Sequence, residues 1–129
     1  MKKLVTGLML LSSLSAFAGL KDCQNLLGNF ECAYENSNVR LVLAKGNSAN
    51  ALEVKIEGEG GKYIVDGKKR ASKEDDSEYT ALCTAGKKIE IRNVFRDQLQ
   101  IVSLTATDEG ILYSLEQSRG GLSLTCKRI

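Results

Sequence analysis

A regular alternation of apolar and polar residues constrains the fold of this chain more than any other feature. In residues 52–57 (LEVKIE) aliphatic side chains occupy every second position, and charged side chains fill the positions between them. Successive side chains of a β-strand point to opposite faces, so this segment is predicted to be a strand with one buried and one solvated face. The same alternation recurs at residues 30–35, 39–43, 88–92, 111–116 and 122–127. The pattern indicates an all-β fold of antiparallel strands.

Turn-forming residues separate these strands at short intervals. They gather at residues 36–38, 45–47, 58–61, 66–67, 85–86, 96–97, 108–110 and 119–121. The strongest hairpin signal is Asp66-Gly67, because a type I′ turn needs positive φ at both central positions. Short connections favour pairing between consecutive strands, which predicts an up-and-down meander of about 8–10 strands. The chain has no proline. Edge strands often carry proline, so its absence favours closure into a barrel.

The first residues have the pattern of an export signal. Two lysines precede an apolar stretch at residues 4–14, and residues 16–18 (AFA) place small side chains where a signal peptidase cleaves. We therefore expect residues 1–18 to be a signal peptide. Residues 19–129 would then form a single disulfide-stapled β-barrel domain, periplasmic or secreted. The apolar stretch is too short for a membrane anchor, so no membrane insertion is expected.

Charge balance gives no basis for nucleic-acid binding. The chain has 18 Lys and Arg against 16 Asp and Glu. Both lysines of the predicted leader would be removed on export, which leaves a domain with no net side-chain charge. A neutral domain has no general attraction for nucleic acid or for anionic membranes.

Four cysteines fall in the predicted mature domain: Cys23, Cys32, Cys83 and Cys126. An even number of cysteines in an exported chain indicates two disulfides. A zinc site is disfavoured because the chain has no histidine and its cysteine spacing matches no zinc-finger pattern. In a closed barrel the first strand lies antiparallel to the last, which would bring Cys32 close to Cys126. Pairing of Cys23 with Cys126 and of Cys32 with Cys83 stays open as the alternative.

The composition also argues against an enzyme. The chain has no histidine, no Gly-x-Ser-x-Gly nucleophile motif and no phosphate-binding glycine loop. We therefore expect neither catalytic residues nor a cofactor. A small barrel has room for its own side chains or for one small ligand. The first functional hypothesis is a small apolar ligand inside the barrel, and its candidate contacts are Phe30, Tyr34, Leu41, Val54, Ile91 and Tyr113. The alternative is that these side chains fill the interior.

A charged run at residues 68–78 (KKRASKEDDSE) suggests a second kind of binding. Such a loop would recognise an envelope or extracellular protein, with Lys68, Lys69 and Arg70 as the contacts. The alternative is a solvated loop whose basic and acidic halves neutralise each other. Its acidic residues lack the alternating spacing of a calcium loop, so no metal is expected there.

Residues 28–30 (GNF) resemble the Gly-x-Trp element that opens the first strand of lipocalins, with Phe30 in place of the tryptophan. The resemblance implies a lipocalin-like, calycin-type barrel that binds a small apolar ligand. Lipocalins also place a basic residue from near the last strand over that aromatic ring. In this chain Lys127 or Arg128 is the candidate for this role.

Residues 30–32 (FEC) are similar to the start of the small periplasmic inhibitors of c-type lysozyme, which are β-barrels with an aromatic-x-Cys first strand. This second resemblance implies an alternative function, that of a periplasmic inhibitor or interaction module. Those inhibitors insert a Ser-Gly-x-x-x-Tyr-like segment into the lysozyme cleft. The chain contains no match to that segment.

Overall fold

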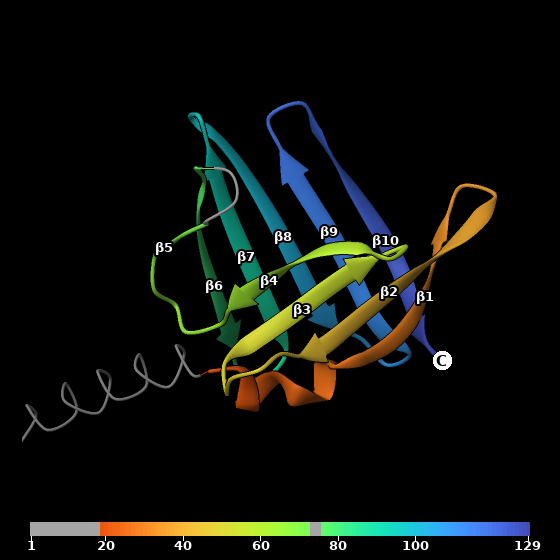
Figure 1. Cartoon of the computed structure of the whole chain (residues 1–129). Coiled ribbons are helices and arrows are strands. Elements are labelled where there is room, and N and C mark those ends of the chain that lie inside the picture. Colours follow the sequence, from red (N-terminus) through yellow and green to blue (C-terminus); the bar gives the residue numbers. More distant parts are fainter. Residues whose placement is uncertain (1–18, 73–75) are drawn as a thin grey trace, which may run out of the picture.

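Ten β-strands form one curled antiparallel sheet in the computed structural model, which describes residues 19–72 and 76–129 (Figure 1). The predicted signal peptide, residues 1–18, lies outside the described residues. In chain order the elements are η1, a 3₁₀ helix (Leu20–Leu26), β1 (Gly28–Tyr34), β2 (Ser37–Lys45), β3 (Ala51–Ile56), β4 (Glu59–Ile64), β5 (Arg70–Ala71), β6 (Glu78–Thr84), β7 (Lys88–Phe95), β8 (Gln98–Ala106), β9 (Gly110–Gln117) and β10 (Gly120–Arg128). No helix of the described part is long and apolar enough to cross a membrane.

The strands follow one another around the sheet in the order β4-β3-β2-β1-β10-β9-β8-β7-β6-β5. β1 also pairs with β10, where Cys32 lies opposite Cys126. The predicted all-β meander, with its first and last strands joined, is therefore confirmed. Tight turns link many neighbours. In Glu57-Gly58, Ala85-Gly86 and Arg96-Asp97 both residues have positive φ, as a type I′ turn requires.

The hydrogen-bond ladder is interrupted at the junction between β4 and β6, which we call the seam. Within the described residues no ladder joins β4 to β5 or β6, and a parallel bridge between Val65 and Ala81 crosses the seam instead. The predicted hairpin at Asp66-Gly67 is therefore wrong. Gly67 has a φ of +76°, but Asp66 does not adopt positive φ, and the strands on either side of the pair do not pair with each other.

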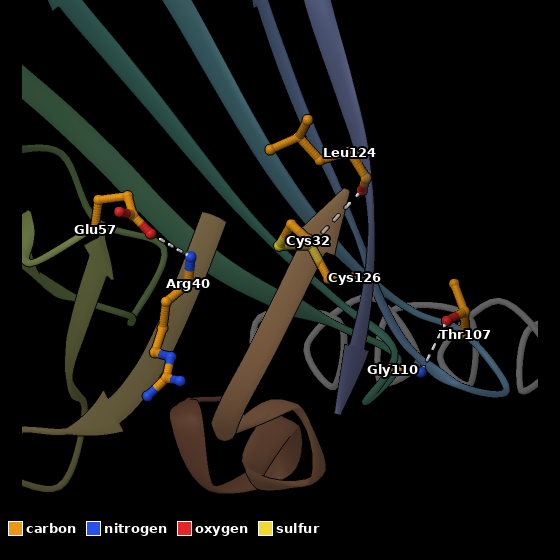
Figure 2. The surroundings of a disulfide bond; sticks show 7 residues. All are labelled: Cys32, Arg40, Glu57, Thr107, Gly110, Leu124 and Cys126. Atoms are coloured by element: carbon orange, nitrogen blue, oxygen red, sulfur yellow. Dashed lines mark hydrogen bonds between the residues drawn. A yellow bond between two sulfur atoms is a disulfide. The ribbon is translucent and has the colours of Figure 1, made fainter. Parts of the chain in front are cut away.

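Two disulfides connect parts of the chain that are far apart in sequence. Cys32–Cys126 joins β1 to β10 (Figure 2), and Cys23–Cys83 joins η1 to β6. The predicted proximity of Cys32 and Cys126 is confirmed, and the alternative pairing is excluded. The sequence separation is 60 residues for Cys23–Cys83 and 94 residues for Cys32–Cys126. Chain-entropy models assign about 4–5 kcal/mol of stabilisation to each loop of this length.

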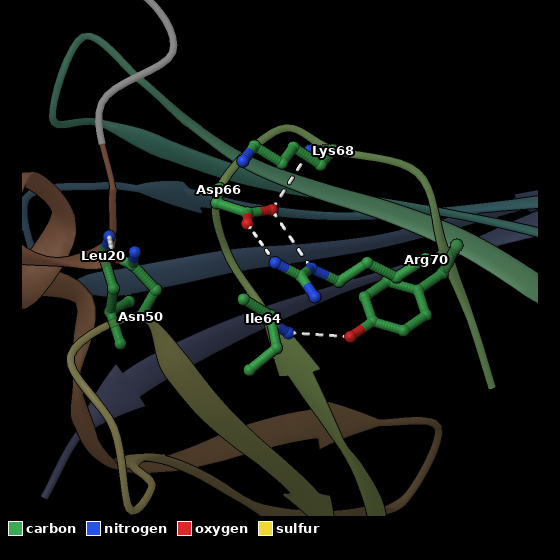
Figure 3. Close-up of polar contacts among 7 residues, drawn as sticks. Leu20, Asn50, Ile64, Asp66, Lys68 and Arg70 are labelled. Carbon is green, nitrogen blue, oxygen red and sulfur yellow. Dashed lines mark hydrogen bonds and ion pairs between the residues drawn. The ribbon is translucent and has the colours of Figure 1, made fainter. Parts of the chain in front are cut away.

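η1 covers one end of the barrel, which we call the closed end (Figure 1). Its apolar residues Leu20, Cys23 and Leu26 are at most 1% exposed, so the helix packs into the barrel as a plug. The backbone N–H of Leu20 donates a hydrogen bond to Oδ1 of Asn50 at 3.1 Å, which fixes the start of the plug to the loop before β3 (Figure 3).

Arg128, near the end of β10, fixes the other end of the plug. Its Nη1 donates to the Leu27 carbonyl oxygen at 2.8 Å and its Nη2 to the Asn25 carbonyl oxygen at 2.7 Å. Its guanidinium carbon lies 4.7 Å from the centre of the Phe30 ring, so the predicted cation over this ring is confirmed and is Arg128. Gly28 has a φ of +144°, and a Cβ there would lie 2.5 Å from Nη1 of Arg128. Glycine therefore leaves the space that this clamp occupies.

Candidate ligand-binding cavity

The inner faces of β7, β8 and β9 are arranged in rows, because residues of neighbouring strands lie directly opposite one another. From the closed end upward we call them the floor row (Ile89, Leu104, Tyr113), the aliphatic row (Ile91, Val102, Leu115) and the amide row (Asn93, Gln100, Gln117). Successive rows are two residues apart along a strand, or about 7 Å. The interior therefore changes from aliphatic to carboxamide over a short distance.

The lower half of the barrel is filled by its own side chains. Ile89 and Leu104 of the floor row are 0% exposed. Three further large residues facing this region, Leu41, Leu43 and Leu52, are at most 1% exposed. Close packing of this kind leaves no room for a ligand. The alternative that apolar side chains fill the interior thus describes the closed half.

Above the floor row the interior is hollow. A cavity of about 360 Å³ lies between the aliphatic row and residues of β3 and β4, among them Val54 and Ile56. It adjoins an outer mouth of about 610 Å³. The residues that line both spaces are Tyr63, Ser77, Asn93 and Gln100. Ligand pockets in proteins have roughly this size, 300–1,000 Å³, and combine an apolar wall with a few polar groups.

Tyr63 and Tyr113 line the cavity, and Tyr79 packs against Tyr63. The rings of Tyr63 and Tyr79 meet edge to face at 5.1 Å, and the Tyr79 hydroxyl accepts a hydrogen bond from the Ile64 N–H at 2.9 Å across the seam (Figure 3). Tyr113 is only 7% exposed. Burial, with a smaller contribution from nearby Tyr63, raises the pKa of the Tyr113 hydroxyl above its ordinary value. Its phenol is therefore neutral at physiological pH.

Among the described residues, three charged ones line these spaces. Glu59 and Lys62 belong to β4, and Arg119 belongs to the turn between β9 and β10. Lys62 Nζ lies 3.9 Å from Oε2 of Glu53, and the Lys62 side chain is 78% exposed. The floor, aliphatic and amide rows contain neutral residues throughout.

The structure separates the six sequence-predicted ligand contacts into two groups. Val54, Ile91 and Tyr113 line the cavity. Phe30 and Leu41 are 0–1% exposed at the closed end, while Tyr34 is 39% exposed next to the turn between β1 and β2. The last three therefore lie away from the cavity. Ligand contact by the first three stays a prediction.

Sequence reasoning missed the amide row. These carboxamides face inward, whereas apolar Leu99 of β8 faces outward and is 43% exposed. The expected pattern of apolar-in and polar-out is thus inverted near the open end. The sequence did contain a signal for this row. Each of the three side-chain amides is two residues along its strand from an inward-facing aliphatic residue.

The basic residues proposed as a protein-binding patch lie between β4 and β6, and two of them have acidic partners. Arg70 pairs with the Asp66 carboxylate, which also accepts the Lys68 backbone N–H at 3.1 Å (Figure 3). The hydrogen bond from Arg70 lowers the pKa of Asp66 below its ordinary value. Lys69 Nζ lies 3.8 Å from Oε1 of Glu78. Binding of a protein by Lys68, Lys69 and Arg70 stays a prediction.

Comparison with known proteins shows the fold. No protein-family model and no curated protein matches this chain. Two mutant crystal structures of the fluorescent protein UnaG superpose with TM-scores of 0.61 and 0.60, each at 11% sequence identity. The matches cover 81% and 82% of this chain and 96% and 97% of the UnaG chains. At this identity the matches show a shared fold alone, and they lend no support to the resemblance to lysozyme inhibitors.

Proposed function

We propose that this chain is an exported, non-enzymatic binding protein that holds one small, mostly apolar ligand in the upper half of its barrel. The observation that carries the proposal is the asymmetry of the interior. One end is plugged by η1 and clamped by Arg128, while the other opens through a polar mouth into a cavity of about 360 Å³. Barrels of this size enclose space for one small ligand at most.

The aliphatic row provides the driving force for binding in this proposal. Covering Ile91, Val102 and Leu115 with a ligand would remove apolar surface from water, at roughly 25 cal/mol per Å². The filled closed half gives the cavity a rigid floor, so little ordering would oppose binding. The calycin-type fold supports the same proposal, because it is shared by barrels that bind small ligands.

Export is part of the proposal. Two disulfides are compatible with an oxidising compartment such as the periplasm or the extracellular space. A signal peptide at residues 1–18 would deliver the chain there. N-terminal sequencing of the protein recovered from the envelope or medium should begin at Gly19, and a retained leader would contradict this part.

A cavity-filling substitution tests ligand binding. The neutral probe N-phenylnaphthylamine should bind the oxidised protein saturably with a rise in fluorescence. Val102→Trp, which places an indole in the cavity, should weaken probe binding at least about tenfold. Ile101→Trp is the matched control. Ile101 is the next residue along β8 from Val102, and its side chain lies on the outer face of the strand with Leu99 and Glu116. Absence of saturable binding, or equal losses in both variants, would overturn the proposal.

A further inference from the structure

The amide row lies at one level of a cavity whose lining is mixed, with aliphatic residues of β3 and the aliphatic row on one side and polar residues of β4 on the other. Asn93 lies directly opposite Gln100, and Gln100 lies directly opposite Gln117, so three carboxamides from three neighbouring strands stand side by side. They are positioned about 7 Å above the aliphatic row, at the level where the cavity meets its mouth. A ligand whose apolar part covers the aliphatic row would therefore bring its polar end to these amides.

The row has unused hydrogen-bonding capacity. Gln100 Nε2 donates to Gln117 Oε1 at 3.5 Å, a long bond. This leaves the Gln100 carbonyl oxygen as an acceptor and the remaining Gln117 N–H groups as donors. Reversing both amides would exchange these roles but would still leave one acceptor and one donor group. The row thus presents donors and acceptors together, whichever orientation its amides adopt.

The row offers no charge to a ligand. Among the described residues that line the cavity and mouth, the cations are Lys62 and Arg119. Lys62 lies beside Glu53 at 3.9 Å with its side chain largely in solvent. Arg119 belongs to the turn at the mouth. The amide row itself therefore presents hydrogen-bonding groups but no cation to a carboxylate, and Arg119 is the cation that shares the mouth with it.

Resting on the proposed function, we infer that the ligand's polar end is uncharged and both donates and accepts hydrogen bonds, as a primary amide or an alcohol does. The floor row lies two rows below the amides, roughly 13 Å deeper. Since this row is closed by Ile89 and Leu104, the apolar part of the ligand is short. The inferred ligand class is a neutral amphiphile of moderate length, and the class it rejects is the fatty acid of the same length.

Competition within one chain-length series tests this inference. Decanamide, decanol and decanoate would each be titrated against bound N-phenylnaphthylamine at a pH where decanoate is ionised. Decanamide should displace the probe at a concentration at least about tenfold below that of decanoate, since the amide row satisfies its hydrogen bonds. Decanoate displacing the probe as well as or better than decanamide would overturn the inference while leaving the proposed function intact.

Variants identify which residues select the ligand. Gln100→Leu and Gln117→Leu should each weaken decanamide binding severalfold relative to probe binding measured in the same variant. The matched control is Gln24→Leu on the exposed surface of η1, which should change neither. Unchanged decanamide affinity in both amide variants would overturn the inference. If the wild-type protein preferred decanoate and Arg119→Gln removed that preference, Arg119 would determine ligand selection instead of the amide row. That result would overturn the inference. Failure of the probe to bind the wild-type protein would remove the proposed function and the inference with it.

Discussion

Replacing Arg128 with alanine should destabilise the barrel without touching the cavity. The guanidinium makes two charge-assisted hydrogen bonds to the carbonyl oxygens of Asn25 and Leu27 and covers the Phe30 ring at 4.7 Å. Together these contacts hold the C-terminal side of η1 against β1 and β10. Because η1 is the plug of the closed end, losing them should loosen the packing of Leu26 beneath.

The expected cost follows from counting these contacts at values suited to an exposed side chain. Each hydrogen bond contributes about 0.5–1 kcal/mol after solvent screening. The cation over the ring adds about 0.5–1 kcal/mol. The sum is roughly 2 kcal/mol, which lowers the Tm of a domain of this size by roughly 10 °C. Arg128→Lys should recover less than half of it, because an ammonium lacks the planar fork that reaches both carbonyls.

Thermal and urea unfolding of the oxidised protein, followed by circular dichroism, would measure this loss. The matched control is Lys127→Ala, an adjacent exposed cation, which should change stability by less than about 0.5 kcal/mol. The reasoning would be refuted if Arg128→Ala and Lys127→Ala unfolded at the same temperature, or if Arg128→Lys matched the wild type.

Three further predictions concern the staples, the seam and one turn. Replacing Cys32 and Cys126 together with serine should lower the unfolding free energy by about 4–5 kcal/mol in urea titrations, and equal midpoints for the oxidised and variant proteins would contradict the loop-entropy argument. Asp66 has a folded-state pKa lowered by Arg70, so its contribution is complete above its unfolded value near 3.8 and is lost as pH falls through the lower folded pKa. Asp66→Asn should therefore flatten the pH dependence of stability between about pH 4 and 2, and an unaltered profile would contradict this. Ala85→Asn should stabilise the protein by roughly 0.5–1 kcal/mol, because Ala85 has a φ of +53° and Asn tolerates that conformation. The same change at exposed Ala71 should give no such gain in thermal unfolding.

The strands that could be predicted from sequence are those whose inner face is apolar along its length. β3 alternates Leu52, Val54 and Ile56 with charged residues, and the structure pairs it as such a strand must. β8 escaped prediction because its inward positions change from Leu104 to Gln100 toward the open end. A hollow barrel has an inner face that need not be apolar everywhere, so period-two hydrophobicity marks only its filled half.

The seam was beyond sequence prediction for a different reason. Asp66-Gly67 has the local chemistry of a hairpin, but its outcome is set by contacts formed with β6. The Gly67 N–H donates to the Ala81 carbonyl oxygen at 2.8 Å, and Arg70 takes up the Asp66 carboxylate. Contact with another strand also explains why residue 60 of β4 is a glycine. A Cβ there would lie 1.6 Å from the Val54 carbonyl oxygen of β3. The sequence shows these glycines, but the contacts with other strands that require them become visible only in the fold.

The positions of the two disulfides follow from where the ladder is weak. On its seam side β6 lacks a full neighbouring strand, so few backbone hydrogen bonds hold that flank of the sheet. Cys23–Cys83 ties this flank to η1, and Arg128 ties η1 to β1 and β10. Cys32–Cys126 then secures the short junction of β1 with β10, where three residue pairs are in register. Both covalent bonds lie in or beside the filled half, and of the two only Cys23–Cys83 reaches the seam flank. The strands around the cavity are therefore positioned by the closed end and do not need side chains that pack across the cavity.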